Sequence, residues 1–340
     1  MELALVLIVL ILAVGFDFTN GFHDAANAIA TVVSTRTLPP KVALLMAAVM
    51  NLVGALLGTE VAETIANSIL SLDDTPMNLH LLILLGALIG AISWNLITWA
   101  FGLPSSSSHA LIGGLAGSGA VAMLFNSQVQ VQWRSIVEKV IYPMLTSPLV
   151  GFVLAFFLMT LVRFLLRNAS AAKTFPRFRI LQIISSSAMA LGHGLQDAQK
   201  TMGIMFLAAT AVNWVDPAQG IPLWVKLLAA SAISLGTYSG GWRIMKTLGR
   251  KIIDLDVSQG FVAEMTGASV LYVTAFFMHA PISTTHTITA AVMGVGATKG
   301  AKAVRWSTAQ NIVGAWVLTL PASAAMGALS FGLLHLVLPL

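Results

Sequence analysis

The stretch NGFHDAANA, residues 20–28, places a histidine, an aspartate and two asparagines directly after the apolar run MELALVLIVLILAVGFDFT. The chain of 340 residues is 57% hydrophobic and 9% charged, and its mean hydropathy is +0.87. In soluble proteins about 25% of the residues are charged. These values predict an all-α polytopic membrane protein. They place the polar cluster inside the lipid bilayer, where such residues are rare and usually functional.

The composition also narrows the class of protein. The sequence has no cysteine, which excludes disulfides and thiolate metal sites. The basic residues, which give a pI of about 9.7, lie in short loops between apolar runs. This distribution is typical of the cytoplasmic loops of membrane proteins and does not indicate nucleic-acid binding. The first apolar segment carries Glu2 and no cleavage site, so we expect a retained membrane helix rather than a signal peptide.

The polar cluster has a counterpart in the second half of the chain. GFHDAANA (21–28) aligns with GLQDAQKT (194–201) at an offset of 173 residues. A second pair of motifs, PSSSSH (104–109) and PISTTH (281–286), aligns at an offset of 177 residues. Two matches in the same order at nearly one spacing indicate an internal duplication.

The duplication divides the chain into a first repeat at 1–168, a connector at 169–178 and a second repeat at 179–340. The connector and its surroundings are basic and should be cytoplasmic, whereas neither terminus has a Lys or Arg nearby and both should be periplasmic. Equivalent loops carry acids at 60–74 and bases at 243–251. The two repeats are therefore expected to have inverted topology, which is typical of secondary transporters with a substrate site near the midplane.

The apolar segments predict about 10–12 membrane segments. Leu79–Phe101, Tyr142–Leu166 and Ile312–His335 are long enough to cross about 30 Å of hydrocarbon. Residues 3–35 and 179–212 are each too long for one crossing. We expect both to be interrupted at their Gly/His/Asp clusters, so that the fold contains broken or re-entrant helices.

The two hydroxyl motifs predict an anion site. A helix that begins with proline and a run of hydroxyls offers free backbone N–H groups, side-chain donors and the positive end of the helix dipole. Inverted symmetry would direct two such N-termini at each other, an arrangement that suits a tetrahedral oxyanion such as phosphate. The alternative is that the hydroxyls only cap buried helices. The candidate substrate-binding residues are Ser105, Ser106, Ser107, Ser108, Ser283, Thr284 and Thr285.

The buried acids Asp24 and Asp197 predict a path for a coupling cation, because an intramembrane carboxylate is costly unless it is paired or protonated. Asn20, Asp24 and Asn27 could supply oxygens to Na⁺. In the second repeat Lys200 stands at the position of Asn27, so its ammonium group could replace a bound cation and favour coupling to H⁺. A purely structural ion pair between Asp197 and Lys200 is the alternative.

Four histidines lie in the motifs, and each could donate to the anion, relay protons or cap a helix. They are His23, His109, His193 and His286. A membrane hydrolase is the competing class, since Ser, His and Asp all occur in membrane segments. The chain has no G-x-S-x-G turn and its polar groups are duplicated, so we do not expect an enzyme, a cofactor or a resident metal.

These motifs resemble those of the inorganic phosphate transporter (Pit) family. NGFHDAANAIATVVSTRTLPP (20–40) and HGLQDAQKTMGI (193–204) look like that family's paired signatures, and PSSSSH and PISTTH look like its second pair. The resemblance implies a bacterial inner-membrane symporter that imports inorganic phosphate. By position it makes Asp24, Asn27 and Asp197 cation or proton residues. It makes the hydroxyls phosphate ligands and permits a homodimer.

Two positions depart from many family members. Gln196 stands where many have asparagine, and Lys200 stands where sodium-coupled members tend to have asparagine. The DAQK form resembles the proton-coupled bacterial carriers of metal–phosphate complexes. Coupling to Na⁺ and transport of sulfate on the same scaffold stay open as alternatives. A passive anion channel, which would not accumulate phosphate, is the alternative of another class.

Overall fold

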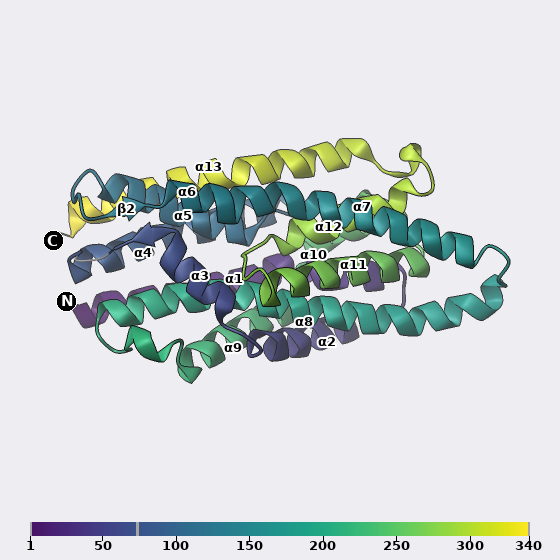
Figure 1. Cartoon of the computed structure of the whole chain (residues 1–340), viewed down its shortest axis with the longest axis horizontal. Helices are drawn as coiled ribbons and strands as arrows, with labels where there is room; N and C mark the ends of the chain where they lie inside the picture. The colour runs from purple at the N-terminus through teal and green to yellow at the C-terminus, as the bar shows by residue number, and fades with distance from the viewer. Residues whose placement is uncertain (1, 73–74, 339–340) are drawn as a thin grey trace.

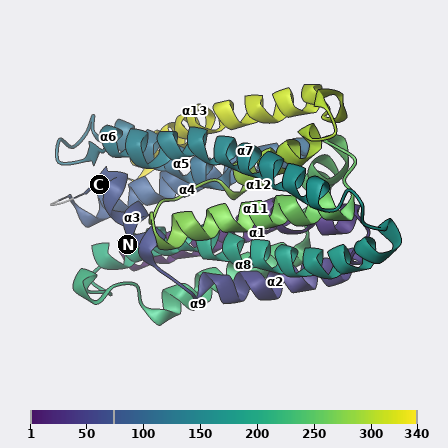
Figure 2. The same ribbon diagram turned by 45° about the vertical axis from the view of Figure 1, so that its right-hand side comes forward.

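The computed structural model describes residues 2–72 and 75–338, and most of them are helical. The helices lie roughly along one long axis (Figures 1 and 2). Those of the first half are α1 (Glu2–Ser34), α2 (Pro40–Ala55), α3 (Glu60–Ser68), α4 (Met77–Phe101), α5 (Ser107–Ala122), α6 (Trp133–Ile136) and α7 (Tyr142–Leu165). Those of the second half are α8 (Ala171–Ala211), α9 (Leu223–Ser239), α10 (Trp242–Lys246), α11 (Val257–Phe276), α12 (Thr284–Ala297) and α13 (Trp306–Val337).

The remaining regular elements are short. Two π-helical turns follow α6 and α10, at Val137–Ile141 and Thr247–Lys251. Two 3₁₀ turns lie at Pro217–Gln219 and Ala301–Ala303. The strands β1 (Leu70–Ser71) and β2 (Gln130–Val131) form one antiparallel pair, with Leu70 opposite Val131.

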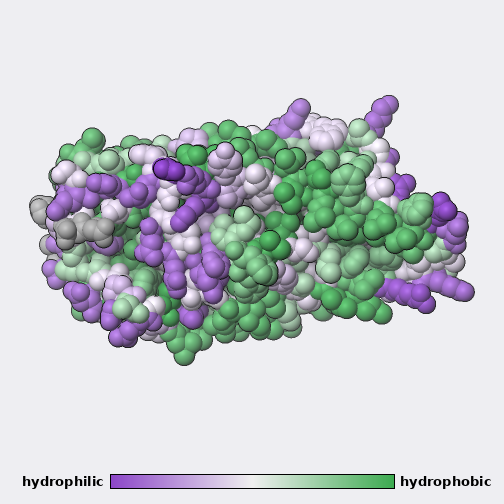
Figure 3. All heavy atoms as spheres, in the orientation of Figure 1, coloured by the Kyte–Doolittle hydropathy of each residue, from purple (hydrophilic) through white to green (hydrophobic). Residues whose placement is uncertain are grey.

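The surface supports a membrane location. Apolar residues cover a broad zone across the middle of the face in Figure 3, and hydrophilic residues gather toward the two ends. Large exposed apolar side chains such as Phe157, Leu161 and Leu329 belong to the long helices α7 and α13. Because lipid replaces water around a spanning segment, an apolar exterior is stable there. The protein is therefore a multi-pass membrane protein.

Among the described residues, four helices are long and apolar enough to cross a membrane by themselves: α1, α4, α13 and the continuous helical stretch Trp133–Leu165 that contains α7. The pair α2 and α3, bent by 68° at its break, would add a fifth. In the described residues, α2, α5, α8, α9, α11 and α12 are also helices of 14 or more residues, but each is shorter or more polar than those four. The expected total of 10–12 membrane segments stays a prediction.

The helices that carry matching motifs run in opposite directions. Helices α1 and α8 both carry the acidic motif, and in Figure 1 α1 runs from left to right whereas α8 runs from right to left. The helices that begin at the hydroxyl motifs, α5 and α12, likewise run away from each other (Figure 1). Most of the connector at 169–178 belongs to the first turns of α8 rather than to a loop.

The expected interruption of the long segments at their Gly/His/Asp clusters is wrong. Helices α1 and α8 continue unbroken through both clusters. The glycines serve close packing instead: a Cβ on Gly21 would lie 2.8 Å from the Thr237 nitrogen, and one on Gly194 would lie 2.6 Å from the Asn51 Cα. Contacts this short require glycine, so α1 packs tightly on α9 and α8 on α2. The chain is instead interrupted before α5 and α12, which begin in the protein interior.

Candidate functional site

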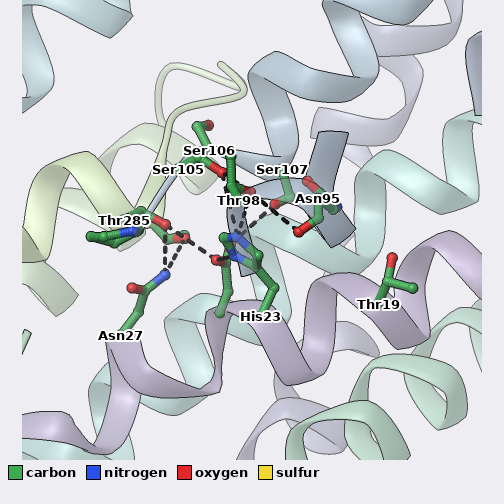
Figure 4. A network of polar contacts seen from close by, with 12 residues as sticks. Thr19, His23, Asn27, Asn95, Thr98, Ser105, Ser106, Ser107 and Thr285 are labelled. Carbon is green, nitrogen blue, oxygen red and sulfur yellow. Dashed lines mark hydrogen bonds and ion pairs between the residues drawn. The ribbon is translucent and has the colours of Figure 1, made fainter. Parts of the chain in front are cut away.

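The site lies where α1 and α8 meet the first turns of α5 and α12, and Figure 4 shows its part around His23 and Asn27 of α1. Each of the latter helices is capped by a serine of its motif. The Ser106 hydroxyl accepts a hydrogen bond from the His109 N–H at 3.3 Å, and the Ser283 hydroxyl accepts one from the His286 N–H at 3.2 Å. A serine N-cap is favourable because it pairs one of the free N–H groups of the first turn. The capping role weighed from the sequence is therefore real for these two serines.

Asp24 on α1 is the meeting point of the two hydroxyl motifs. His23 Nδ1 lies 2.6 Å from Asp24 Oδ1. Ser107 donates to Asp24 Oδ2 at 3.1 Å, and Thr285 donates to Asp24 Oδ1 at 3.4 Å. Hydroxyls from sequence positions far apart thus converge on one carboxyl group, and they pair its buried oxygens.

Asp197 on α8 has a different set of partners. Lys200 forms an ion pair with Asp197 and also donates to the Ser108 hydroxyl. Asp197 Oδ2 lies 3.1 Å from His193 Nε2 and accepts a hydrogen bond from Thr284 at 3.4 Å. Lys200 is therefore held between the acid of the second repeat and the hydroxyl motif of the first.

The two asparagines of α1 lie differently. The Asn27 side-chain nitrogen donates to Thr285 at 2.8 Å and to Thr284 at 3.4 Å, and its side-chain oxygen has no hydrogen bond among the described residues. Neither side-chain atom of Asn20 has a hydrogen bond within this part of the chain. Asn27 thus belongs to the contact between α1 and α12, whereas Asn20 lies outside the network around Asp24.

The site is closed to solvent and holds two carboxyl groups and one lysine. Its hydroxyls, acids, histidines and Lys200 are each 2% exposed or less. One ligand atom each from Asp24, His193 and Asp197 lies within 4.8 Å of the others. When both carboxyl groups are ionised, the one ammonium group leaves no excess positive charge to attract an anion. An anion at the hydroxyl motifs would therefore need an additional cation beside it, because like charges at such short range repel strongly in a low dielectric.

The remaining expected residues support the site from its sides. His23 Nε2 lies 3.0 Å from the Thr98 hydroxyl. The rings of His109 and His286 lie 4.9 Å apart, and His286 stacks on Trp316 at 4.0 Å. Gln196 donates to Thr274 at 3.0 Å, which ties α8 to α11. These contacts bring most of the expected residues into one region, but Asn20 lies outside the network and Gln196 faces α11.

Three buried polar residues were not predicted from the sequence. Thr98 on α4 bonds to His23 and accepts a hydrogen bond from Ser105 at 2.8 Å. No local pattern marks it, because its place depends on how α4 packs on α1. Asp17 lies seven residues before Asp24 on the same helix face, and that spacing could have revealed it. Glu264 on α11 is buried among hydroxyls, among them Ser185 at 2.5 Å.

Comparisons with known proteins show which family the chain is similar to. The model of the phosphate transporter family matches residues 20–327. A probable low-affinity inorganic phosphate transporter of Bacillus subtilis is 43% identical over 98% of both chains, and one of Rhizobium meliloti is 46% identical over 97% of both. A solved structure described as a sodium-dependent phosphate transporter is 26% identical, covers 98% of this chain and 100% of its own, and superposes with a TM-score of 0.88.

The family match spans nearly the whole chain, and it includes the acidic motifs on α1 and α8 and the hydroxyl motifs before α5 and α12. The family and these relatives are transporters, not enzymes. The chain belongs to the phosphate transporter family and is a membrane protein that transports phosphate.

Proposed function

We propose that this transporter is a proton-coupled symporter that imports inorganic phosphate across the bacterial inner membrane. Both termini face the periplasm, and the two halves act as inverted repeats around the buried site. Phosphate binds between the N-termini of α5 and α12, where the hydroxyls now bonded to Asp24 and Asp197 become its donors. Neutral hydroxyl donors suit transport, because they release an anion more readily than a charged clamp.

The placement of Lys200 is the observation that supports H⁺ as the coupling ion. Its ammonium group lies between Asp197 and Ser108, where a metal cation beside phosphate would otherwise bind. A fixed positive charge there leaves a proton as the mobile cation that balances the incoming anion. Asp24, Asn27 and Asp197 complete the coupling group around Lys200, and Asn20 extends it along α1.

Sodium coupling is the second candidate, because the solved structure with a TM-score of 0.88 is described as a sodium-dependent phosphate transporter. The cluster of Asp24, His193 and Asp197 also has the donor types and the spacing that suit a divalent metal. It could therefore receive the metal of a metal–phosphate complex as cargo.

The test is uptake of radiolabelled phosphate into proteoliposomes with pH and Na⁺ gradients imposed separately. The outside is held at about pH 5 and the inside at about pH 6, so that phosphate is nearly all monoanion on both sides. One proton per phosphate then predicts accumulation of about tenfold. Accumulation that requires Na⁺ would replace the proposal with the second candidate, and strong competition by sulfate would change the substrate.

A pair of variants tests where phosphate binds. Ser107→Ala removes a hydroxyl that faces Asp24, and Ser118→Ala removes one from the same helix that bonds the Gly327 carbonyl at 3.0 Å. We expect a higher KM for phosphate in Ser107→Ala and an unchanged KM in Ser118→Ala. Equal effects in the two variants would contradict the proposed binding site.

A further inference from the structure

A second polar group lies on α1 about two turns before Asp24. It consists of Asp17 and Asn20 on α1 and Thr201 on α8, all with an exposed fraction of 0%. Asn20 and Thr201 are the polar side chains that face the Asp17 carboxylate. None of the side-chain oxygen and nitrogen atoms of these three residues has a well-formed hydrogen bond among the described residues. Buried polar atoms are rarely left in this state unless they serve a function or receive a ligand.

Asp17 differs in this respect from the other buried acids. Four carboxylates are buried in the part of the chain that the structure describes. Asp24 and Glu264 accept hydrogen bonds from side-chain hydroxyls, and Asp197 forms an ion pair with Lys200. Only Asp17 of the four has neither a cation nor a well-formed donor. It is therefore the acid whose charge the surrounding protein compensates least.

The charged groups around Asp17 do not change this balance. Those that act on it are Asp197 and Lys200, both from α8 and opposite in sign, and they are already paired with each other. The helices α4 and α9 also pack against α1, and among the described residues neither brings a charged group to Asp17. An ionised carboxylate without a cation or donors is strongly unfavourable in the interior of a membrane protein. A proton on Asp17 would remove this cost.

We propose that Asp17, together with Asn20 and Thr201, is the site that carries the coupling proton. The proposal rests on the proton symport proposed above and names the residue that performs the coupling. A proton from periplasmic water adds to an Asp17 oxygen while the site is open outward, and its O–H can then donate to the Asn20 or Thr201 oxygen. The same proton leaves to cytoplasmic water after the site opens inward, so no other bond forms or breaks.

This location explains how the movements of proton and phosphate are linked. Closure of the protein around phosphate removes Asp17 from water, which is unfavourable unless the carboxylate is neutral. The loaded transporter therefore closes only when a proton accompanies the anion. Asn20 lies on the same face of α1 as Asp17 and Asp24, between the two, so the proton site adjoins the phosphate site without sharing its donors.

The test compares Asp17→Asn with Glu264→Gln in proteoliposomes. Both variants replace a buried carboxyl by an amide of similar shape, but Glu264 accepts well-formed hydrogen bonds from hydroxyls and Asp17 accepts none among the described residues. Phosphate exchange is measured at equal pH on the two sides, and accumulation is measured with about pH 5 outside and about pH 6 inside. We expect Asp17→Asn to retain exchange while its accumulation falls from about tenfold to about onefold. Glu264→Gln should keep the tenfold accumulation.

The other outcomes of this comparison also support or overturn the inference about Asp17. Tenfold accumulation in Asp17→Asn, or a loss confined to Glu264→Gln, overturns the inference. If Asp17→Asn also loses exchange, Asp17→Glu decides: restored accumulation supports the proton site, and no restoration overturns it. A wild type that accumulates phosphate only with Na⁺ refutes proton symport together with this inference. A proton-driven wild type with an unaffected Asp17→Asn variant refutes the inference alone.

Discussion

Replacement of Lys200 by methionine should destabilise the protein by leaving Asp197 as an unpaired buried charge. Methionine keeps most of the volume and the unbranched shape of the lysine stem, so the change removes mainly the ammonium group. Loss of one partner of a buried ion pair typically costs about 3–5 kcal/mol. We expect a value near 3 kcal/mol, because His193 at 3.1 Å and the Thr284 hydroxyl at 3.4 Å remain as partners of Asp197.

A double variant separates the lost pair from lost packing. Lys200→Met with Asp197→Asn removes both charges, so most of the cost of the single change should be recovered. The assay is reversible unfolding of the purified protein in detergent micelles by titration with a denaturing detergent. A free energy of unfolding for Lys200→Met within 1 kcal/mol of the wild type would refute the reasoning, and so would a double variant as unstable as the single one.

Three further predictions concern the site, the packing and a helix cap. Asp24→Asn removes the charge that His23 Nδ1 approaches at 2.6 Å, and we expect concentrative phosphate uptake to be lost while expression in the membrane stays normal. Gly114→Ala places a Cβ 2.5 Å from the Ala87 carbonyl oxygen, which should lower the free energy of unfolding by about 1–3 kcal/mol. Asp256 caps α11; burial alone would raise its pKa, but the hydrogen bonds that it accepts and the nearby lysine lower it overall. Asparagine is as good an N-cap as aspartate, so Asp256→Asn should cost at most about 1 kcal/mol at neutral pH, through loss of the partly exposed ion pair with Lys299. Because a lowered pKa stabilises the fold only while the carboxylate is charged, that difference should disappear as the pH falls below the ordinary value of 3.8.

The measurements for these predictions are uptake into membrane vesicles with immunoblotting, and unfolding at several pH values. Full accumulation in Asp24→Asn would exclude that residue from coupling. An unchanged unfolding free energy in Gly114→Ala would mean that α4 and α5 can separate without cost. A stability difference for Asp256→Asn that persists at the lowest pH would show that the charge of the cap is unimportant.

The motifs of the site could be predicted from the sequence because they come in pairs. Two acidic motifs and two hydroxyl motifs at nearly one offset indicate two halves that meet, and the structure brings Ser107 and Thr285 to the same Asp24 carboxylate. The polar residues are few in an apolar chain, so each one is conspicuous. Asp17 could have been predicted as a site residue in the same way, because it lies on the same helix face as Asn20 and Asp24.

Other features depend on packing that the local pattern does not contain. The glycines of the acidic motifs suggested breaks, but Gly21 and Gly194 lie against backbone atoms of neighbouring helices, and α1 and α8 remain continuous. A glycine weakens a helix by only about 1 kcal/mol relative to alanine, which tight packing against another helix readily offsets. Thr98 joins the network around His23 only because α4 crosses α1 at that level.

A structure of the transporter with bound phosphate would test the central claim most directly. It would be determined by electron cryomicroscopy at about pH 5 and without Na⁺. We predict density for phosphate between the first turns of α5 and α12, within hydrogen-bond distance of Ser107 and Thr285, whose hydroxyls would have turned away from Asp24. Phosphate bound elsewhere, with both hydroxyls still donating to Asp24, would contradict this account.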